Sequence, residues 1–513
     1  MTDNLPYESA IISDFGLRSK NLFNAIFFPG KRLGMKISFT KITAAILALL
    51  LLTFSPLSPM PGIRRAFALS IEEEKKLGEE VVREVEGKFT LVRDPALLEY
   101  MNALGQDILK TAAPQPFPFR FYLLKDPQLN AFSVPGGHVF LTTGIIELME
   151  SEGELAGLIG HEIAHVTRRH ISNRMDQQKK IGLATMAAVL LGVFAGDPRI
   201  ASATIAGSLA TAQTLFLKYS RDDEDEADNY GFKYMAGAGF NPKGMNELLD
   251  KLRRWGSFGS ETIPAYMQTH PLTADRMARV EDLLQIYTGR GSWPRSTSDE
   301  FRRLQIILLS QYGDLQRARN RFQSLAKDDQ NQFWVLYGQG WIAIREGKMD
   351  TANDLFEKAL VLRPKDPYVL TDLGRAYLKQ GRFDLALQKL GEASILHPKD
   401  GNAAFFLGRV YQEKGQDQLA LENFNRSLRS GLENEDLYYY TGLIYGKLNQ
   451  LGQAHYHFGK SFQIKGDREK ALFHYKTALK YSGNDFREKE RIEKEIKNLE
   501  RGKKDKEKPP DRF

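Results

Sequence analysis

The stretch EGELAGLIGHEIAHVTRRH, residues 152–170, decides how the first half of the chain is interpreted. Its apolar residues recur at helical spacing, which predicts a helix with a buried face. His161 and His165 are four residues apart, so both imidazoles project from the same side of that helix and can bind one zinc ion. Glu162 lies beside them, where it can hold a water molecule. The alternative is an ordinary core helix with solvated histidines. His170 follows His161 by nine residues, so on a continuous helix it faces away, and we leave it out of the predicted site.

A catalytic zinc ion needs a third protein ligand and an open position for water. The segment YSRDDEDEADNYGFKYM, residues 219–235, offers Glu224 and Asp228, which share a helix face because they are four residues apart. We predict that Glu224 binds the metal and that Asp228 accepts a hydrogen bond from a ligand imidazole or assists a proton transfer. The other acids are expected to form a solvated face near a helix N-terminus: Asp222, Asp223, Asp225 and Glu226.

The chain contains no cysteine, which excludes disulfides, thiolate catalysis and cysteine-bound zinc. Any metal must therefore be held by histidine, aspartate or glutamate. The net charge is +7, but residues 1–68 hold eight Lys/Arg against three acids, so only +2 remains for the rest. This distribution provides no case for nucleic-acid binding.

Residues 119–146, FRFYLLKDPQLNAFSVPGGHVFLTTGII, are the strand-like part of the chain. Runs rich in β-formers are interrupted there by Asp-Pro and Pro-Gly-Gly turn signals, which predicts a small sheet beside the helices. We expect the strand around Gly136 and Gly137 to offer an edge to which an extended peptide adds as a further strand. His138, on the same edge, is expected to be structural.

The second half of the chain has a 34-residue repeat, which is the tetratricopeptide (TPR) period. Small residues recur because paired helices approach closely, and glycine permits the turn between them. One series has Asn449 in its next place: Gly313, Gly347, Gly381 and Gly415. A second series has the same period: Gly340, Gly374, Gly408 and Gly442. We predict a TPR solenoid over residues 300–482, then a charged helix and disordered tail over 483–513.

The N-terminal residues 1–68 resemble an export signal. From Met35, which we consider as an alternative start, two lysines precede an apolar run at 42–54, and Ala66-Phe67-Ala68 completes the pattern. We expect cleavage near Ala68, with an uncleaved anchor as the alternative, and location in a bacterial periplasm.

A second apolar region covers residues 181–196, IGLATMAAVLLGVFAG, and a weaker run follows it. Each run is shorter than a membrane-spanning helix requires. We favour a buried helical hairpin near the site, and the alternative is that residues 181–215 contact a membrane surface or an unfolded client.

HEIAH at 161–165, SRDDEDEAD at 220–228 and THPLTADR at 269–276 occur in an order that resembles the M48 family of zinc metallopeptidases. The trailing repeats resemble the periplasmic branch of that family. The resemblance implies one Zn²⁺ per chain, a metallopeptidase domain over 69–295, and these roles: His161, His165 and Glu224 as ligands, Glu162 as catalytic base and Asp228 as its partner acid.

The resemblance also places His270 on a loop that closes over the metal, as a regulator or fourth ligand. From the residues alone, His270 before a proline is a structural cap at a helix entrance. Arg276 is expected to orient that loop or to stabilise an oxyanion.

We therefore expect a mainly α protein in which a zincin-like α+β metallopeptidase domain precedes a TPR solenoid. Its expected function is that of an exported zinc endopeptidase. The resemblance implies quality control of stalled outer-membrane proteins, contact with the β-barrel assembly machinery through the repeats, and a chaperone-like activity. The alternative is a non-proteolytic TPR scaffold with a closed or inactive zinc site, against which the intact set of site residues argues.

Overall fold

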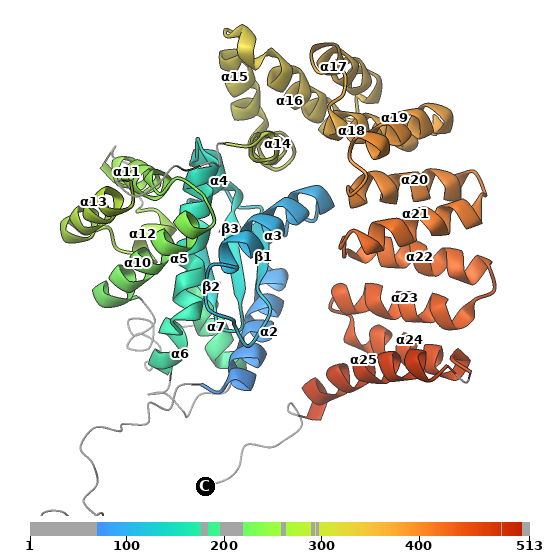
Figure 1. The fold of residues 1–513 in the computed structure, drawn as a ribbon, viewed down its shortest axis with the longest axis horizontal. Helices are drawn as coiled ribbons and strands as arrows, with labels where there is room; N and C mark the ends of the chain where they lie inside the picture. Colours follow the sequence, from blue (N-terminus) through green and yellow to red (C-terminus); the bar gives the residue numbers. More distant parts are fainter. Residues whose placement is uncertain are drawn as a thin grey trace, which may run out of the picture. The chain divides into compact units, whose positions relative to one another are not determined.

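The structure is a computed structural model, and it describes residues 69–175, 183–194, 219–257, 263–288, 293, 297–483 and 485–504. The predicted signal peptide and the second apolar run lie outside these residues. The predicted fold class is confirmed, because one small sheet packs among helices in the first part and paired helices follow in the second (Figure 1).

The first part of the chain contains three strands and ten helices within the described residues. The strands are β1 (Arg120–Leu124), β2 (Ala131–Val134) and β3 (His138–Thr142). The helices are α2 (Ile71–Lys88), α3 (Pro95–Leu109), α4 (Thr143–Leu148), α5 (Glu152–Thr167), α6 (His170–Met175), α7 (Leu183–Phe194), α10 (Arg221–Gly237), α11 (Lys243–Ser257), α12 (Ala265–Thr269) and α13 (Ala274–Thr288).

The sheet has the order β1-β3-β2, with β3 parallel to β1 and antiparallel to β2. Gly136 and Gly137 form the tight turn between β2 and β3, both at φ +89°. A Cβ on Gly137 would lie 2.6 Å from the Pro118 carbonyl oxygen, so the turn packs closely against the segment that contains Pro118. The prediction that these two glycines offer a substrate edge is therefore wrong. His138 lies on the central strand, and β2, whose residues are buried, is at one end of the strand order.

Helix α5 is the centre of this part of the molecule. A capping box starts it, since the Ser151 hydroxyl accepts from the Glu154 amide while the Glu154 carboxylate accepts from the Ser151 amide. Every residue from Leu155 to Val166 is buried. This all-round burial follows from the low polarity of the helix, which packs against α3, α10, α11 and the sheet.

Helix α7 contributes a buried apolar face to the core beside α2. Leu190 and Phe194 are fully buried in a cluster with Leu77, Val81 and Phe132. The described helix thus agrees with the buried interpretation of the first apolar run. No helix among the described ranges is long and apolar enough to cross a membrane.

The second part is a succession of helical pairs (Figure 1). Its elements are α14 (Asp299–Ile307), the π-helix η2 (Leu308–Tyr312), α15 (Leu315–Leu325), the 3₁₀-helix η3 (Asp329–Asn331), α16 (Gln332–Arg345), α17 (Met349–Leu362), α18 (Pro367–Lys379), α19 (Phe383–Leu396), α20 (Gly401–Glu413), α21 (Asp417–Arg429), α22 (Glu435–Lys447), α23 (Leu451–Ile464), α24 (Arg468–Tyr481) and α25 (Phe486–Lys504).

The two glycine series have different roles in the structure, and Gly313, at φ -77°, is the member of the first series outside the left-handed region. Gly381 and Gly415 adopt φ of 72° and 70° at the turns between paired helices, and Asn449 in the same register adopts φ 56°. In the second series, a Cβ on Gly408 would lie 2.5 Å from the Phe424 ring of the partner helix. Only glycine allows the paired helices to approach this closely.

Candidate metal centre

Two helices bring the predicted ligands together. Helix α5 carries His161 and His165, and helix α10 carries Glu224 in its first turn. The helices pack closely at a glycine contact, because a Cβ on Gly160 would lie 3.0 Å from the Gly231 carbonyl oxygen. This close approach places the Glu224 carboxylate against the two imidazoles.

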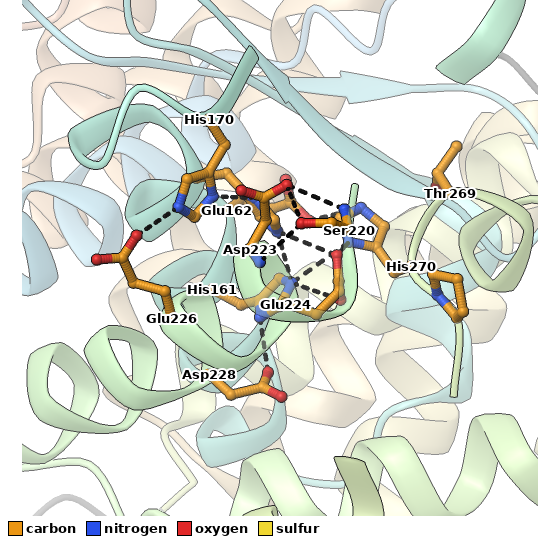
Figure 2. Close-up of polar contacts among 12 residues, drawn as sticks. His161, Glu162, His170, Ser220, Asp223, Glu224, Glu226, Asp228, Thr269 and His270 are labelled. Carbon is orange, nitrogen blue, oxygen red and sulfur yellow. Dashed lines mark hydrogen bonds and ion pairs between the residues drawn. The ribbon is translucent and has the colours of Figure 1, made fainter. Parts of the chain in front are cut away.

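The donor atoms of His161, His165, Glu224 and His270 all lie within 4.8 Å of one another, and all four side chains are buried. The Nε2 atoms of His161 and His165 are 2.9 Å apart, and the Glu224 Oε1 atom is 3.5 Å from His165 Nε2. Figure 2 shows these side chains converging from separate segments of the chain. The sequence prediction thus selected residues that the fold gathers into one cluster.

His270 completes the cluster from the C-terminal end of α12. Its Nδ1 atom is 2.9 Å from Glu224 Oε1 and 3.3 Å from His161 Nε2. The Tyr266 ring stacks on the imidazole at a centroid distance of 4.5 Å and holds it in this orientation. His270 therefore lies where a fourth ligand would bind.

Glu162 is the unpaired acid of the site. Its side chain is completely buried, and neither carboxylate oxygen has a hydrogen-bond partner within the described part of the chain. The His270 Nε2 atom lies 3.6 Å from Glu162 Oε1. A buried carboxylate without partners is costly unless a further group satisfies it.

The donor set fits zinc, which prefers imidazole nitrogen and carboxylate oxygen ligands. Burial holds the pKa of His165 well below its usual range, so this imidazole is neutral at pH 7, as a ligand must be. The unpaired oxygens of Glu162 suit a water molecule held beside such an ion. The residues thus fit a zinc site of the peptidase type.

Asp228 and Arg276 lie outside the ligand cluster and contact two of its members, His161 and Glu224. Asp228 Oδ1 lies 2.9 Å from His161 Nδ1, on the side of the ring opposite the cluster. Arg276 donates to both Asp228 oxygens, at 2.7 and 2.9 Å, and also contacts Glu224. Burial raises the pKa of both acids, but the Arg276 charge and the neighbouring imidazoles together outweigh it and leave both pKa values below their usual range. Because its guanidinium is held by two carboxylates, the geometry favours orientation over oxyanion binding for Arg276.

The expectation that His170 faces away from the site is wrong. Helix α5 ends at Thr167, Arg169 adopts φ 59°, and α6 begins at His170, so the chain bends between the two helices. The His170 Nδ1 atom consequently lies 2.9 Å from His165 Nδ1. Neither glycine nor proline marks this bend, so the sequence provides no signal for it.

Two further residues near the metal ligands were missed. Glu226, predicted to be part of a solvated face, has Oε2 2.9 Å from His170 Nε2. The Tyr219 ring covers His165 at a centroid distance of 3.6 Å. Both lie in the acidic segment that supplied Glu224, and the Glu226 contact depends on the bend at Arg169.

Comparison with known proteins agrees with this geometry. Residues 96–284 match Peptidase family M48, and residues 343–390 and 371–445 match tetratricopeptide-repeat families. The chain contains an M48 peptidase domain. M48 peptidases are zinc metallopeptidases, and the matched segment includes every residue of the cluster around His161.

Several proteases are similar to this chain over part of its length. The beta-barrel assembly-enhancing protease of Yersinia pestis is 30% identical over 325 residues, which cover 62% of this chain and 66% of that protein. Its namesake in Escherichia coli K12 is 28% identical over 324 residues, covering 61% of this chain and 64% of the relative. The metalloprotease LoiP of Escherichia coli is 28% identical over 232 residues, covering 42% and 83% respectively. The chain thus spans just under two thirds of the length of the first two relatives.

Proposed function

We propose that this chain is a zinc-dependent endopeptidase. The observation that carries the proposal is the buried cluster of His161, His165 and Glu224 beside Glu162, whose carboxylate has no hydrogen-bond partner in the described residues. A solely structural metal site has no need for an unpaired acid next to the ligands.

Each residue then has a chemical task. A zinc ion in the cluster supplies a Lewis acid that acidifies water and polarises a peptide carbonyl. Glu162 takes the proton of the attacking water and returns it to the leaving amine. Asp228 fixes the tautomer and orientation of His161 through its 2.9 Å contact. Strand β2, at the end of the strand order, is the edge to which an extended substrate adds.

His270 is proposed to control access to the metal. Its imidazole lies against two of the ligands and next to the catalytic base, so substrate needs this side chain to move. The short α12 segment that carries it, with Tyr266 as the stacking partner, is the element that must shift. The protease is therefore closed in this arrangement.

The cellular role we propose is quality control of envelope proteins in the periplasm, with one Zn²⁺ per chain. Two relatives are named for enhancing β-barrel assembly, and the TPR solenoid is a surface for binding proteins. Clients would be unfolded or stalled outer-membrane proteins, and the repeats would dock them or the assembly machinery. We also propose cleavage of the signal near Ala68 and domains over 69–295 and 300–482, followed by the charged helix.

The test is to purify the chain, measure its zinc content, and follow cleavage of casein as an unfolded substrate. We expect about one zinc per chain, loss of cleavage with a chelator, recovery with added zinc, and faster cleavage by His270→Ala. A zinc-loaded protein that leaves casein intact, even as His270→Ala, would favour the non-proteolytic scaffold. A chain that binds no zinc would contradict the metal site itself.

A further inference from the structure

The two ligand histidines of α5 are supported in different ways. His161 directs its Nδ1 atom at a carboxylate, Asp228, at 2.9 Å. His165 directs its Nδ1 atom at another imidazole, His170, also at 2.9 Å. His170 in turn places its Nε2 atom 2.9 Å from Glu226 Oε2, and Figure 2 shows this contact leading away from the cluster. Each ligand ring thus ends on an acid of α10, one directly and one through an intermediate ring.

The tautomers of this chain of contacts follow from the site. His165 faces the cluster with Nε2, which needs a free lone pair there, so its proton resides on Nδ1. That proton is donated to Nδ1 of His170, which must then carry its own proton on Nε2. The Nε2 proton is donated to Glu226, whose other oxygen accepts from Arg168 at 2.8 Å. Each contact from His165 through His170 to Glu226 thus pairs one donor with one acceptor.

The bend that places His170 against His165 is held by a partly buried ion pair. Arg169 adopts φ 59°, a left-handed conformation that is unfavourable for a residue with a Cβ. Its guanidinium Nε donates to Glu74 Oε1 at 2.7 Å, and Glu74 is buried on α2. A chain held in an unfavourable conformation by a specific buried partner indicates that the position of His170 is built into the fold.

We propose that His170 and Glu226 form a positioning relay for the zinc ligand His165. The relay fixes the His165 tautomer and ring orientation and increases the basicity of its Nε2 atom, as outer carboxylates do for metal-bound imidazoles. His170 is not a ligand, because the nitrogen nearest the cluster is already engaged by His165 Nδ1. The inference rests on the proposed metal site, since without zinc there is no ligand to position.

The test is the zinc affinity of the full chain, measured by competition with a chromophoric chelator. We expect His170→Ala to weaken zinc binding about 10- to 100-fold. Glu226→Ala should weaken it in the same direction but less, because the Glu226 side chain is 37% exposed and water can replace it. Asp225→Ala is the matched control, since Asp225 lies next to Glu226 on α10 and pairs with Arg279 instead.

A second measurement separates positioning from general stability. In His170→Gln the amide oxygen can still accept the His165 proton, so affinity should recover partly, and the metal-free proteins should unfold at similar temperatures. The visible spectrum of the Co²⁺-substituted His170→Ala chain should shift relative to wild type, because the geometry of one ligand changes.

The outcomes are distinguishable from those of the proposed function. A wild-type chain without measurable zinc affinity contradicts the metal site and the relay together. Tight zinc binding by wild type, with His170→Ala and Glu226→Ala both within twofold of Asp225→Ala, overturns the relay and leaves the peptidase proposal intact. A loss confined to His170→Ala overturns the part assigned to Glu226.

Discussion

Removing the charge of Arg276 should destabilise the metal-free protein far more than an ordinary ion-pair loss. Arg276 is 2% exposed and is the cation that faces both Asp228 and Glu224, which are buried to the same degree. Methionine keeps most of the side-chain length but leaves two carboxylates without their counter-ion. Breaking a buried pair in this way costs about 3–5 kcal/mol, because an uncompensated charge remains in the interior.

Helix α13 provides a matched control one turn further on. Arg279 also pairs with an acid of α10, Asp225, but the two side chains are 46% and 26% exposed. Such a surface pair contributes about 0–1 kcal/mol, so Arg279→Met should change little. Both substitutions remove an arginine from the same helix facing the same partner helix, and they differ in burial.

The assay is calorimetric unfolding of chelator-treated protein. For a domain of this size, 1 kcal/mol shifts the unfolding temperature by about 2–4 °C, so Arg276→Met should lower it by about 6–20 °C and Arg279→Met by at most about 4 °C. Added zinc should raise the unfolding temperature of Arg276→Met, because the ion replaces part of the missing positive charge at Glu224. Equal small shifts for both variants would refute the reasoning that Arg276 neutralises the two buried acids.

Three further predictions test other parts of the structure. Gly231→Ala should separate α5 from α10, since the new Cβ would lie 3.0 Å from the His161 amide nitrogen. Calorimetry should show that the free energy of unfolding falls by about 1–3 kcal/mol, and chelator competition should show a weaker zinc affinity. An unchanged affinity would contradict the close contact between the helices. Burial and Asp400 raise the pKa of Glu99 to about 7, so the free energy of unfolding should fall as pH rises from about 4.5 to about 7. Glu99→Gln should therefore raise the free energy of unfolding at pH 8 by about 1–3 kcal/mol and leave it unchanged at pH 4. An equal effect at both pH values would argue against the shift. Neither Gly381 nor Gly391 would bring a new Cβ against a neighbour, so the two alanine variants differ in backbone conformation. Gly381→Ala should lower the free energy of unfolding by about 1–2 kcal/mol because of its φ of 72°, whereas Gly391→Ala inside α19 should raise it by up to about 1 kcal/mol. The same sign in urea titrations of both variants would refute the turn assignment.

The parts of the fold that follow from local periodicity were predictable. The spacing of four between His161 and His165, and between Glu224 and Asp228, fixes which side chains share a helix face. The 34-residue register likewise predicted the turn at Asn449, where a residue other than glycine takes the left-handed conformation. These predictions need only the geometry of one helix or one repeat.

The parts that depend on where a helix ends, or on how strands pair, were not predictable. His170 was excluded because the helix was assumed to continue beyond Thr167, and Arg169 at the bend pairs with Glu74, almost one hundred residues earlier. Gly136 and Gly137 were placed at an edge, since the sequence does not state that β3 pairs on both sides. In both cases the deciding contact is distant in the sequence.

The most direct test of the central claim is casein cleavage by the zinc-loaded Glu162→Gln chain, with zinc content measured on the same sample. The buried glutamine keeps the shape of the site and removes the group that accepts the proton. We expect this variant to bind about one zinc per chain, as wild type does, and to cleave casein at least about 100-fold more slowly. Cleavage at the wild-type rate by a fully zinc-loaded Glu162→Gln chain would contradict the assignment of this cluster as a peptidase active site.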